Sequence, residues 1–276
     1  MLEETFRKGF IVPELPDVEV YKHQLEANGL RKVIDHIELR NADRMLGDTD
    51  AEVLRGRLAG HSLTGTARHG KYLFARIGGN AWLMLHFGMT GYFTYGNDGE
   101  ADPRHNVLVL FYKDRSHLAF NCRRKLGAIA LVENPEEFIR KKRLGPDAAS
   151  LSESGFSELL KEHGGTLKGF LMNQESLAGL GNVYSDEILF QAGIHPRTRL
   201  DSLGDSERKA VYRAMQKVMR LAVEAEAEPE RMPRTFLTPL RNRRNAECPF
   251  CGGPPKRISA SGRHAWYCPC RQPEPR

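Results

Sequence analysis

Pro13 and Glu14 open the run Pro-Glu-Leu-Pro-Asp-Val-Glu, and their chemistry depends on where the mature chain begins. A proline with a free amino group is a secondary amine, which can attack an electrophilic carbon and form a Schiff-base (iminium) adduct, as lysine amines do elsewhere. A proline inside a chain has an amide nitrogen and cannot. Because residues 1–12 precede Pro13, this chemistry requires Pro13, and not Met1, to be the first residue of the mature protein.

The same run also fits an ordinary helix start. Pro16 suits a first helical turn, and the acidic side chains of Asp17 and Glu19 suit the positive end of a helix dipole. An Asn-Gly pair at 28–29 suits the end of the helix. We therefore expect an amphipathic helix over residues 13–29, and the run alone does not decide between a helix start and a reactive amine.

A cluster of cysteines near the C-terminus predicts a metal site. Two Cys-x2-Cys pairs separated by about sixteen residues are typical of a zinc ribbon, in which four thiolates hold one structural Zn²⁺. The second pair is one residue short, so either the knuckle is distorted or His264 replaces one thiolate; a disulfide or an empty site is the alternative. The candidate ligands are Cys248, Cys251, Cys268 and Cys270.

The elements that must position these residues change in type along the chain. Between residues 31 and 132 the sequence predicts mostly short strands in close succession, which is typical of a sandwich or barrel. From Asn134 the apolar residues follow helical spacing. The predicted strands are 32–39, 62–77, 81–87, 107–112, 117–121 and 128–132; the predicted helices are 135–144, 154–163, 167–172, 182–192 and 205–226; a last hairpin is predicted over 256–259 and 265–267.

The composition and the net charge limit which classes of function are possible. The 276-residue chain has a net charge of +6, 40% hydrophobic residues and a pI of about 9.1, which is typical of a globular protein and compatible with a polyanionic partner. Five arginines and no acid fall between Arg231 and Arg244, a pattern that favours phosphate binding over a merely solubilising tail. The start lacks the apolar stretch of a signal peptide, and no segment is long enough to span a membrane.

Four separated motifs, together with the cysteine cluster, resemble the formamidopyrimidine-DNA glycosylase/endonuclease VIII family of base-excision repair enzymes. They occur in the family's order and extend the resemblance from Pro13 to about Gln272, with residues 1–12 as an N-terminal extension. The motifs are Pro13-Glu14-Leu15-Pro16, Arg68-His69-Gly70-Lys71-Tyr72-Leu73, Leu85-His86-Phe87-Gly88-Met89-Thr90-Gly91 and Gly179-Leu180-Gly181-Asn182-Val183-Tyr184-Ser185-Asp186-Glu187.

The resemblance implies an α+β, multidomain fold. It consists of an N-terminal helix with a β-sandwich over residues 13–143, a helix–two-turn–helix domain over 144–235, and a zinc-ribbon hairpin over 236–276. It also implies a monomeric enzyme of the bacterial cytoplasm and nucleoid. Its expected partner is duplex DNA with damaged bases or abasic sites, not a membrane, and its expected cofactor is one structural Zn²⁺.

The resemblance assigns roles to single residues. The Pro13 amine attacks C1′ of the damaged nucleotide, Glu14 is an acid toward the deoxyribose ring oxygen, Lys71 assists β-elimination, and Arg263 assists δ-elimination and binds phosphate. Met89 fills the gap left by the extruded base, and Arg124 faces the orphaned base. The phosphate ligands on the lesion strand are His86, Lys168 and Asn182.

Some of these assignments also follow from the residues. Backbone N–H groups at a helix start make a phosphate site. Asn182 opens a predicted helix after Gly-Leu-Gly and therefore suits phosphate binding. An asparagine at this position is also an ordinary N-cap.

The sequence departs from the family in one motif. The family's Asp-Pro-Arg-Arg-Phe-Gly becomes Cys122-Arg-Arg-Lys-Leu-Gly here, so that Leu126 replaces a phenylalanine wedge. That departure leaves the preferred opposite base open.

The implied function is a bifunctional DNA glycosylase and AP lyase acting on oxidised bases. The Pro-Glu-Leu-Pro start favours oxidised purines, yet the segment near 227–240 lacks the Gly-Gly-Thr-Thr pattern of oxidised-guanine enzymes, so the lesion stays open. If Pro13 stays blocked by residues 1–12, a protein that only binds damaged or abasic DNA is the alternative. A third possibility, a zinc-ribbon protein unrelated to repair, would explain the basic tail but not the first 190 residues.

Overall fold

A computed structural model describes residues 12–78, 81–97, 104–241 and 243–275. The chain divides into two compact units. Apart from its N-terminal residues, the first unit is Asp17–Lys142, and the second combines Glu14–Pro16 with Arg143–Arg276. Helix α1 (Leu15–Asn28) therefore begins in the second unit and continues in the first.

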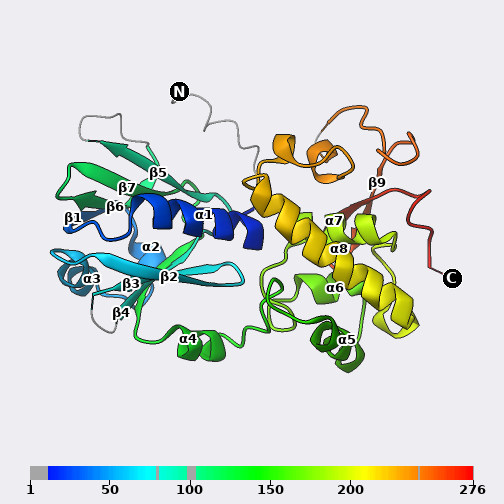
Figure 1. Ribbon diagram of the computed structural model, residues 1–276, viewed down its shortest axis with the longest axis horizontal. Helices are drawn as coiled ribbons and strands as arrows, with labels where there is room; N and C mark the ends of the chain where they lie inside the picture. The colour runs from blue at the N-terminus through cyan, green and yellow to red at the C-terminus, as the bar shows by residue number, and fades with distance from the viewer. Residues whose placement is uncertain (1–11, 79–80, 98–103, 242, 276) are drawn as a thin grey trace. The chain divides into compact units, whose positions relative to one another are not determined.

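The first unit contains two four-stranded antiparallel sheets, drawn in blue to green in Figure 1. One has the strand order β2-β3-β4-β8 and the other β1-β6-β7-β5. Leu83 and Leu85 from one sheet and Leu108 and Leu110 from the other belong to the same buried core, so the two sheets form a sandwich. The strands are β1 (Ile34–Leu39), β2 (Leu63–His69), β3 (Tyr72–Ile77), β4 (Ala81–His86), β5 (Gly91–Asn97), β6 (Asn106–Tyr112), β7 (Ser116–Cys122) and β8 (Ala128–Val132).

Helices α1 to α4 also contribute to this unit. The part of α1 that lies here contributes Val18, Tyr21 and Leu25 to the core, at the spacing of one helical face. The sequence did not predict α2 (Asp43–Leu46), α3 (Ala51–Leu58) or strand β5, and it joined β2 and β3 into one element. Helix α4 (Pro135–Lys141) ends the unit.

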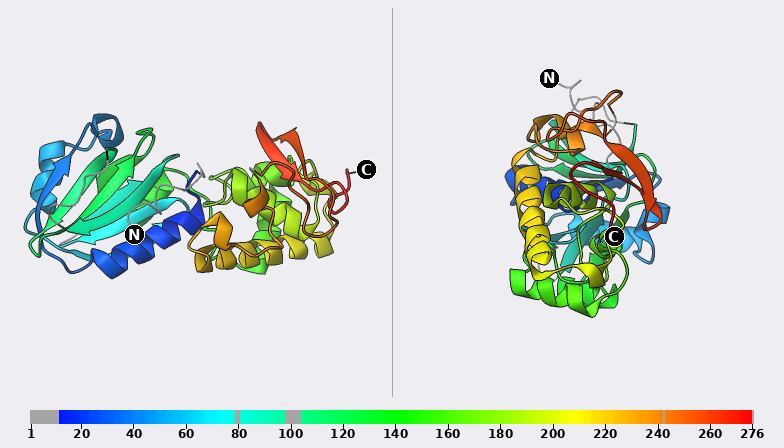
Figure 2. Two further views of the ribbon diagram at one scale, coloured as in Figure 1. Left: turned by 90° about the horizontal axis from the view of Figure 1, so that it is seen from above. Right: turned by 90° about the vertical axis from the view of Figure 1, so that its right-hand side faces the viewer.

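The second unit is mainly helical (Figure 2). Helix α7 (Asn182–Ala192) packs against α8 (Asp205–Glu224) and contacts strand β10 (Arg263–Tyr267). Buried side chains from all four helices form one core, including Phe156, Phe170, Ile188 and Met215. The helices are α5 (Glu153–Glu162), α6 (Leu167–Met172), α7 (Asn182–Ala192) and α8 (Asp205–Glu224).

The C-terminal part of this unit holds the cysteines. Two short 3-10 turns, η3 (Pro229–Arg231) and η4 (Thr238–Leu240), lead to the hairpin of β9 (Lys256–Ala260) and β10 (Arg263–Tyr267). Phe190 of α7 and Leu237 form a small buried cluster with Cys248 and Cys268. The predicted α+β class, with its sandwich, helical region and final hairpin, is confirmed. Among the described residues, no helix is both long and apolar enough to cross a bilayer.

Candidate functional site

The Glu14 carboxylate is bound at the N-terminal end of α7. Its Oε2 accepts hydrogen bonds from the backbone N–H groups of Gly181 at 2.6 Å and Tyr184 at 3.3 Å, and its Oε1 accepts one from Val183 at 2.8 Å. The side chain is 1% exposed. A helix start leaves N–H groups without intrahelical partners and favours negative charge, so these contacts compensate the cost of burying a carboxylate.

A second contact fixes the backbone beside Glu14. The N–H of Leu15 donates to the carbonyl of Gly179 at 2.9 Å. Gly179 has a φ of +117°, and a Cβ there would lie 2.5 Å from the Leu15 side chain. Glycine is therefore required at this close approach, and it keeps the segment that follows Pro13 in register with the start of α7.

This geometry bears on the phosphate expected at the start of α7. The N–H groups of Gly181, Val183 and Tyr184 donate to Glu14, because a carboxylate satisfies the same kind of groups that an anionic ligand would. The side chain of Asn182 is half-buried, and its Oδ1 accepts no hydrogen bond from the described residues. A phosphate contact from Asn182 stays a prediction.

Lys168 lies in the protein interior, in contrast to a solvent-facing phosphate ligand. Its side chain is fully buried, and its ammonium donates to Oδ1 of Asp186 at 2.5 Å and to the hydroxyl of Ser185 at 3.0 Å. Burial lowers the pKa of Lys168, and Asp186 opposes that shift. A direct phosphate contact, which stays a prediction, would require the ammonium to leave Asp186.

The hairpin at the C-terminus presents Arg263 to solvent. Arg263 opens β10 directly after a tight turn in which Ser261 and Gly262 both have positive φ. The Ser261 hydroxyl lies 2.7 Å from that of Thr166, the N-cap residue of α6. The turn is thus fastened to the helical part of the unit while the arginine side chain extends outward.

Lys71 lies at the tip of the β2–β3 hairpin in the first unit. His69 and Tyr72 are paired across the ladder, which leaves Gly70 and Lys71 as a two-residue turn. Arg68 bonds Glu19 of α1 at 2.6 Å and the Gly70 carbonyl at 3.0 Å, so it ties the turn to a helix. The sequence predicted one strand over residues 62–77, and the structure divides it into β2 and β3 at this braced turn.

His86 ends strand β4 and lies within electrostatic range of Lys71 and Lys142. Burial and then these two ammonium groups lower its pKa to about 4. Its Nδ1 accepts a hydrogen bond from the N–H of Gly88 at 3.3 Å, so the ring proton is on Nε2. At neutral pH His86 is therefore an uncharged donor.

Two neighbouring loops of the first unit carry the candidates for filling a gap in DNA. Met89 and Leu126 are 36% and 52% exposed, which is high for large apolar side chains. The Arg124 N–H donates to the Thr90 hydroxyl at 3.1 Å. Gly88 has a φ of +60°, and a Cβ there would lie 2.5 Å from the Leu126 backbone, so the loops pack too closely for any other residue. The predicted wedge residues therefore share one surface.

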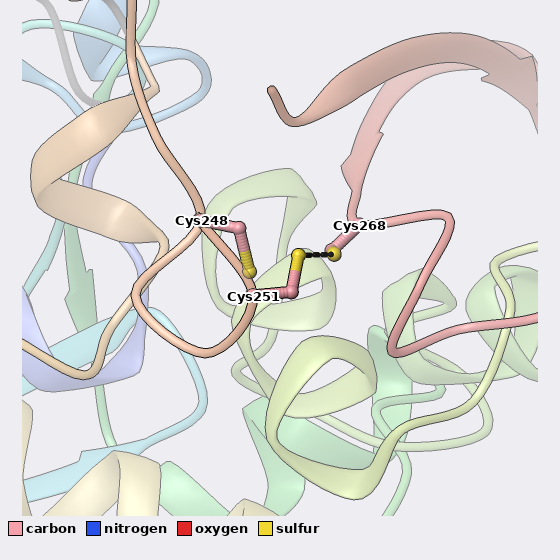
Figure 3. A group of neighbouring side chains, drawn as sticks. All are labelled: Cys248, Cys251 and Cys268. Carbon is pink, nitrogen blue, oxygen red and sulfur yellow. Dashed lines mark hydrogen bonds between the residues drawn. The ribbon is translucent and has the colours of Figure 1, made fainter. Parts of the chain in front are cut away.

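Three of the four predicted zinc ligands converge (Figure 3). The sulfur atoms of Cys248, Cys251 and Cys268 all lie within 4.8 Å of one another, and the last two are 3.4 Å apart. A hydrogen bond from the Gly253 backbone is the main cause of the lowered pKa of Cys251, which favours the thiolate form that binds metals.

These three thiols fit a tetrahedral metal ion, since Zn–S bonds of about 2.3 Å place sulfur atoms just under 4 Å apart. Cys270 does not belong to the converging group, but its thiol neighbours Cys251, which raises the pKa of Cys270. His264 is exposed and does not belong to the group either. Cys270 as the fourth ligand stays a prediction.

Sequence reasoning missed a clamp beside the second cysteine pair. The Arg271 guanidinium donates to the carbonyls of Phe190 at 2.8 Å and Gln191 at 2.9 Å, at the end of α7, and lies 3.8 Å from the ring centroid of Phe250. Gln272 is fully buried and donates to the Ile194 carbonyl at 2.8 Å. The local sequence Cys-Arg-Gln-Pro-Glu-Pro gives no signal that Arg271 and Gln272 would make these contacts.

Comparison with known proteins gives two matches to family models. The formamidopyrimidine-DNA glycosylase N-terminal domain matches residues 12–129, and the formamidopyrimidine-DNA glycosylase H2TH domain matches residues 144–233. Together they span most of the chain.

Individual relatives agree with the family models. The formamidopyrimidine-DNA glycosylase of Solibacter usitatus is 33% identical over 268 residues, which cover 94% of this chain and 98% of the relative. That of Thermus thermophilus is 32% identical over 278 residues, 95% and 99% of the two chains. Among solved structures, a complex of the LlFpg protein with a THF-DNA and an inhibitor matches with a TM-score of 0.85 and 27% identity over 95% of this chain and 100% of that one. The Lactococcus lactis enzyme bound noncovalently to DNA with an AP site matches with a TM-score of 0.84.

The fold and these matches define the class as a DNA-binding repair protein of the DNA glycosylase/AP lyase type, which acts in base excision repair. Within that class, the chain belongs to the formamidopyrimidine-DNA glycosylase family.

Proposed function

We propose that this protein removes oxidised bases, with purines favoured, from duplex DNA and then cuts the abasic strand through a Schiff base at Pro13. The observation that carries the proposal is the anchoring of Glu14 at the start of α7 by three N–H groups. That anchor holds the residue next to the reactive amine in one place, and a fixed nucleophile is what covalent catalysis needs.

The chemistry begins with a proton transfer. A secondary amine is protonated at neutral pH, and both oxygens of Glu14 act as acceptors, so Glu14 takes a proton from Pro13 first. The free amine attacks C1′, the bond to the base breaks, and the base leaves with its electron pair and takes up the proton that remains on the Pro13 nitrogen. Glu14 then returns the proton to the ring oxygen as the sugar opens and the iminium forms.

Elimination follows from the iminium. Loss of a proton from C2′ expels the 3′ phosphate, with Lys71 assisting, and a second elimination expels the 5′ phosphate, with Arg263 assisting. His86 donates an uncharged N–H to a phosphate, and Asn182 and Lys168 contribute further phosphate contacts. Met89 and Arg124 occupy the space that the extruded base leaves.

The cysteine cluster suits a structural Zn²⁺ held by Cys248, Cys251, Cys268 and Cys270. Four protein thiolates would leave the ion no open position for substrate, so it would supply a structural link between the two cysteine pairs and no chemistry of the reaction. These contacts keep the hairpin with Arg263 folded.

The same chain suggests a second function while residues 1–12 remain attached. The Pro13 nitrogen is then an amide of Val12 and has no nucleophilic lone pair. In that form the protein binds abasic or damaged DNA without cutting it, because the phosphate and gap-filling residues do not depend on the amine.

Borohydride trapping on abasic-site DNA tests the proposal. A protein beginning at Pro13 is expected to form a covalent complex, and one beginning at Met1, with its intact mass verified, is not. The Lys71→Ala variant of the shorter protein is the control, and it should still be trapped. Equal trapping of the two starting forms would refute the role of Pro13.

A further inference from the structure

Two adjacent buried carboxylates on α7 hold different parts of the second unit. Asp186 and Glu187 are 1% and 0% exposed, and buried charges need specific partners to offset the cost of desolvation. The hydrogen-bond partners of each carboxylate determine which segments of the unit it holds together.

Asp186 binds three segments at once. Its Oδ1 accepts from the Lys168 ammonium at 2.5 Å, and its Oδ2 accepts from the guanidinium of Arg241 and from the backbone N–H of Trp266 at 3.0 Å. These partners come from α6, from the segment after η4, and from β10. One carboxylate therefore joins a helix, a linker and the terminal hairpin.

Glu187 has a narrower set of partners. Its Oε2 accepts from the N–H and the hydroxyl of Thr238, both at 2.7 Å, and its Oε1 accepts from Gln191 at 2.9 Å. It therefore holds the start of η4 and a residue of its own helix, and none of these hydrogen bonds reaches the hairpin. Glu187 is a matched control for Asp186 in helix and burial.

The bond from Trp266 bears directly on Arg263. Both residues are in β10, three positions apart, and both are paired with β9 in one continuous ladder. Fixing the Trp266 N–H on α7 therefore limits how the strand can shift or rotate, and with it the origin of the Arg263 side chain. The Ser261–Thr166 contact holds only the turn.

We propose that Asp186 is a positioning residue that fixes the Arg263 strand and the Lys168 ammonium relative to each other, with Arg241 supplying the second positive charge. This rests on the proposed function, in which Arg263 assists the second elimination. The guanidinium of Arg241 thus binds a buried carboxylate, although the sequence counted it within the basic stretch that favours phosphate binding.

The expected effect is on the balance of products more than on the first covalent step. Asp186→Asn removes the charge that Lys168 and Arg241 share and places an amide N–H₂ group against one of their donors. Strand β10 is then less well fixed, so the second elimination, which depends on Arg263, should slow, whereas the attack by Pro13 should not.

Single-turnover cleavage of end-labelled abasic DNA by the protein beginning at Pro13 tests this inference. The ratio of β,δ to β product should fall at least about fivefold in Asp186→Asn, with the trapped fraction within about twofold of wild type. Glu187→Gln should keep the wild-type ratio. Arg263→Gln is the reference and should remove nearly all β,δ product. Melting and zinc content report the folding of each variant.

If Asp186→Asn does not fold, the paired change Lys168→Met with Asp186→Leu replaces the buried ion pair by apolar groups, which proteins often tolerate. It still removes the acceptor for Trp266 and should lower the ratio. A wild-type ratio in the folded Asp186 variant, or an equal fall in Glu187→Gln, overturns the inference. A wild-type ratio in Arg263→Gln would instead overturn the proposed role of Arg263.

Discussion

The two ends of helix α7 are both completed by side chains from distant parts of the chain. At the N-terminal end the Glu14 carboxylate accepts from three backbone N–H groups, and at the C-terminal end the Arg271 guanidinium donates to two backbone carbonyls. An anion at the start and a cation at the end match the helix dipole, and each satisfies backbone groups that the helix itself cannot.

The difference between the two ends is in what each one holds. Glu14 follows the proposed nucleophile directly, so the N-terminal end fixes a reactive segment. Arg271 follows the second cysteine pair and stacks on Phe250 between the first two cysteines, so the C-terminal end fixes the metal-binding segment. One helix thus positions chemistry at one end and a structural module at the other, and substitutions at the two ends should separate these roles.

The largest effect is expected at the N-terminal end. In a protein beginning at Pro13, Glu14→Gln should lower the single-turnover rate of base excision by at least about 10²-fold, because general acid–base groups contribute that much. The amide cannot shuttle a proton, but it has nearly the same shape. Binding of uncleaved damaged duplex, measured by fluorescence anisotropy, should change by less than about threefold. A loss of binding with normal excision by the bound fraction would reverse the assignment.

At the C-terminal end, Arg271→Ala should affect stability and leave the chemistry intact. Two charge-assisted hydrogen bonds and a stacked ring contact are lost, so the second unit should be less stable by about 1–3 kcal/mol. Zinc, which we expect at one ion per wild-type chain, should be released faster to a chelator. Arg271→Lys retains the charge without the planar fork and should recover only part of the stability. A normal melting temperature together with slow excision would contradict the contrast between the two ends.

The effect of pH on stability through His86, in the first unit, gives a prediction that does not involve α7. The pKa of His86 is lowered from 6.5 to about 4, so below pH 6.5 the unfolded chain binds a proton that the folded chain does not take up until about pH 4. Stability from this group therefore falls as the pH drops from 6.5 to 4, by up to about 3 kcal/mol. Thermal melting at pH 7.5 and 5 should show a smaller acid-induced loss in His86→Gln than in wild type. An equal loss would mean that other groups dominate.

The smallest effect is expected for the side chain of Asn182, the first residue of α7. Asn182→Ala should weaken binding of damaged and undamaged duplexes equally, by a few fold, because a phosphate contact carries no base information. The salt dependence of binding should not change, since Asn182 is neutral. Lys168→Ala is the charged comparison and should flatten the slope by about one unit if its ammonium reaches a phosphate. Weakening limited to damaged DNA would assign Asn182 to lesion recognition.

Much of the fold follows from local pattern. The strands with alternating apolar residues and the long helices with apolar faces were predicted to within a few residues. Helix α3 was missed because it interrupts a strand-rich stretch, although Asp50 caps it and Leu54 and Leu58 lie one turn apart on its buried face. Strand β5 was missed because its first residue, Gly91, belongs to a glycine-containing motif and its last residues, Gly96 and Asn97, are typical of a turn.

The site was only partly accessible from the sequence. Motifs identified Glu14, Lys71, Asn182 and the cysteines as residue types, since each type has a restricted chemistry. They did not show that Glu14 occupies the donors at the start of α7, because the two segments are about 170 residues apart and no local pattern links them. The sequence likewise did not show that the positive charge of Arg241 is paired with a buried carboxylate, that of Asp186.

The central claim is that the amine of Pro13 is the nucleophile at the anchored N-terminal end of α7. The most direct test is to trap a protein beginning at Pro13 on abasic DNA with borohydride, digest the complex, and locate the modified residue by mass spectrometry. We expect the reduced sugar on the Pro13 nitrogen, in the peptide that begins Pro-Glu-Leu-Pro. Modification of Lys71, or of any other lysine, with an unmodified Pro13 would contradict the account.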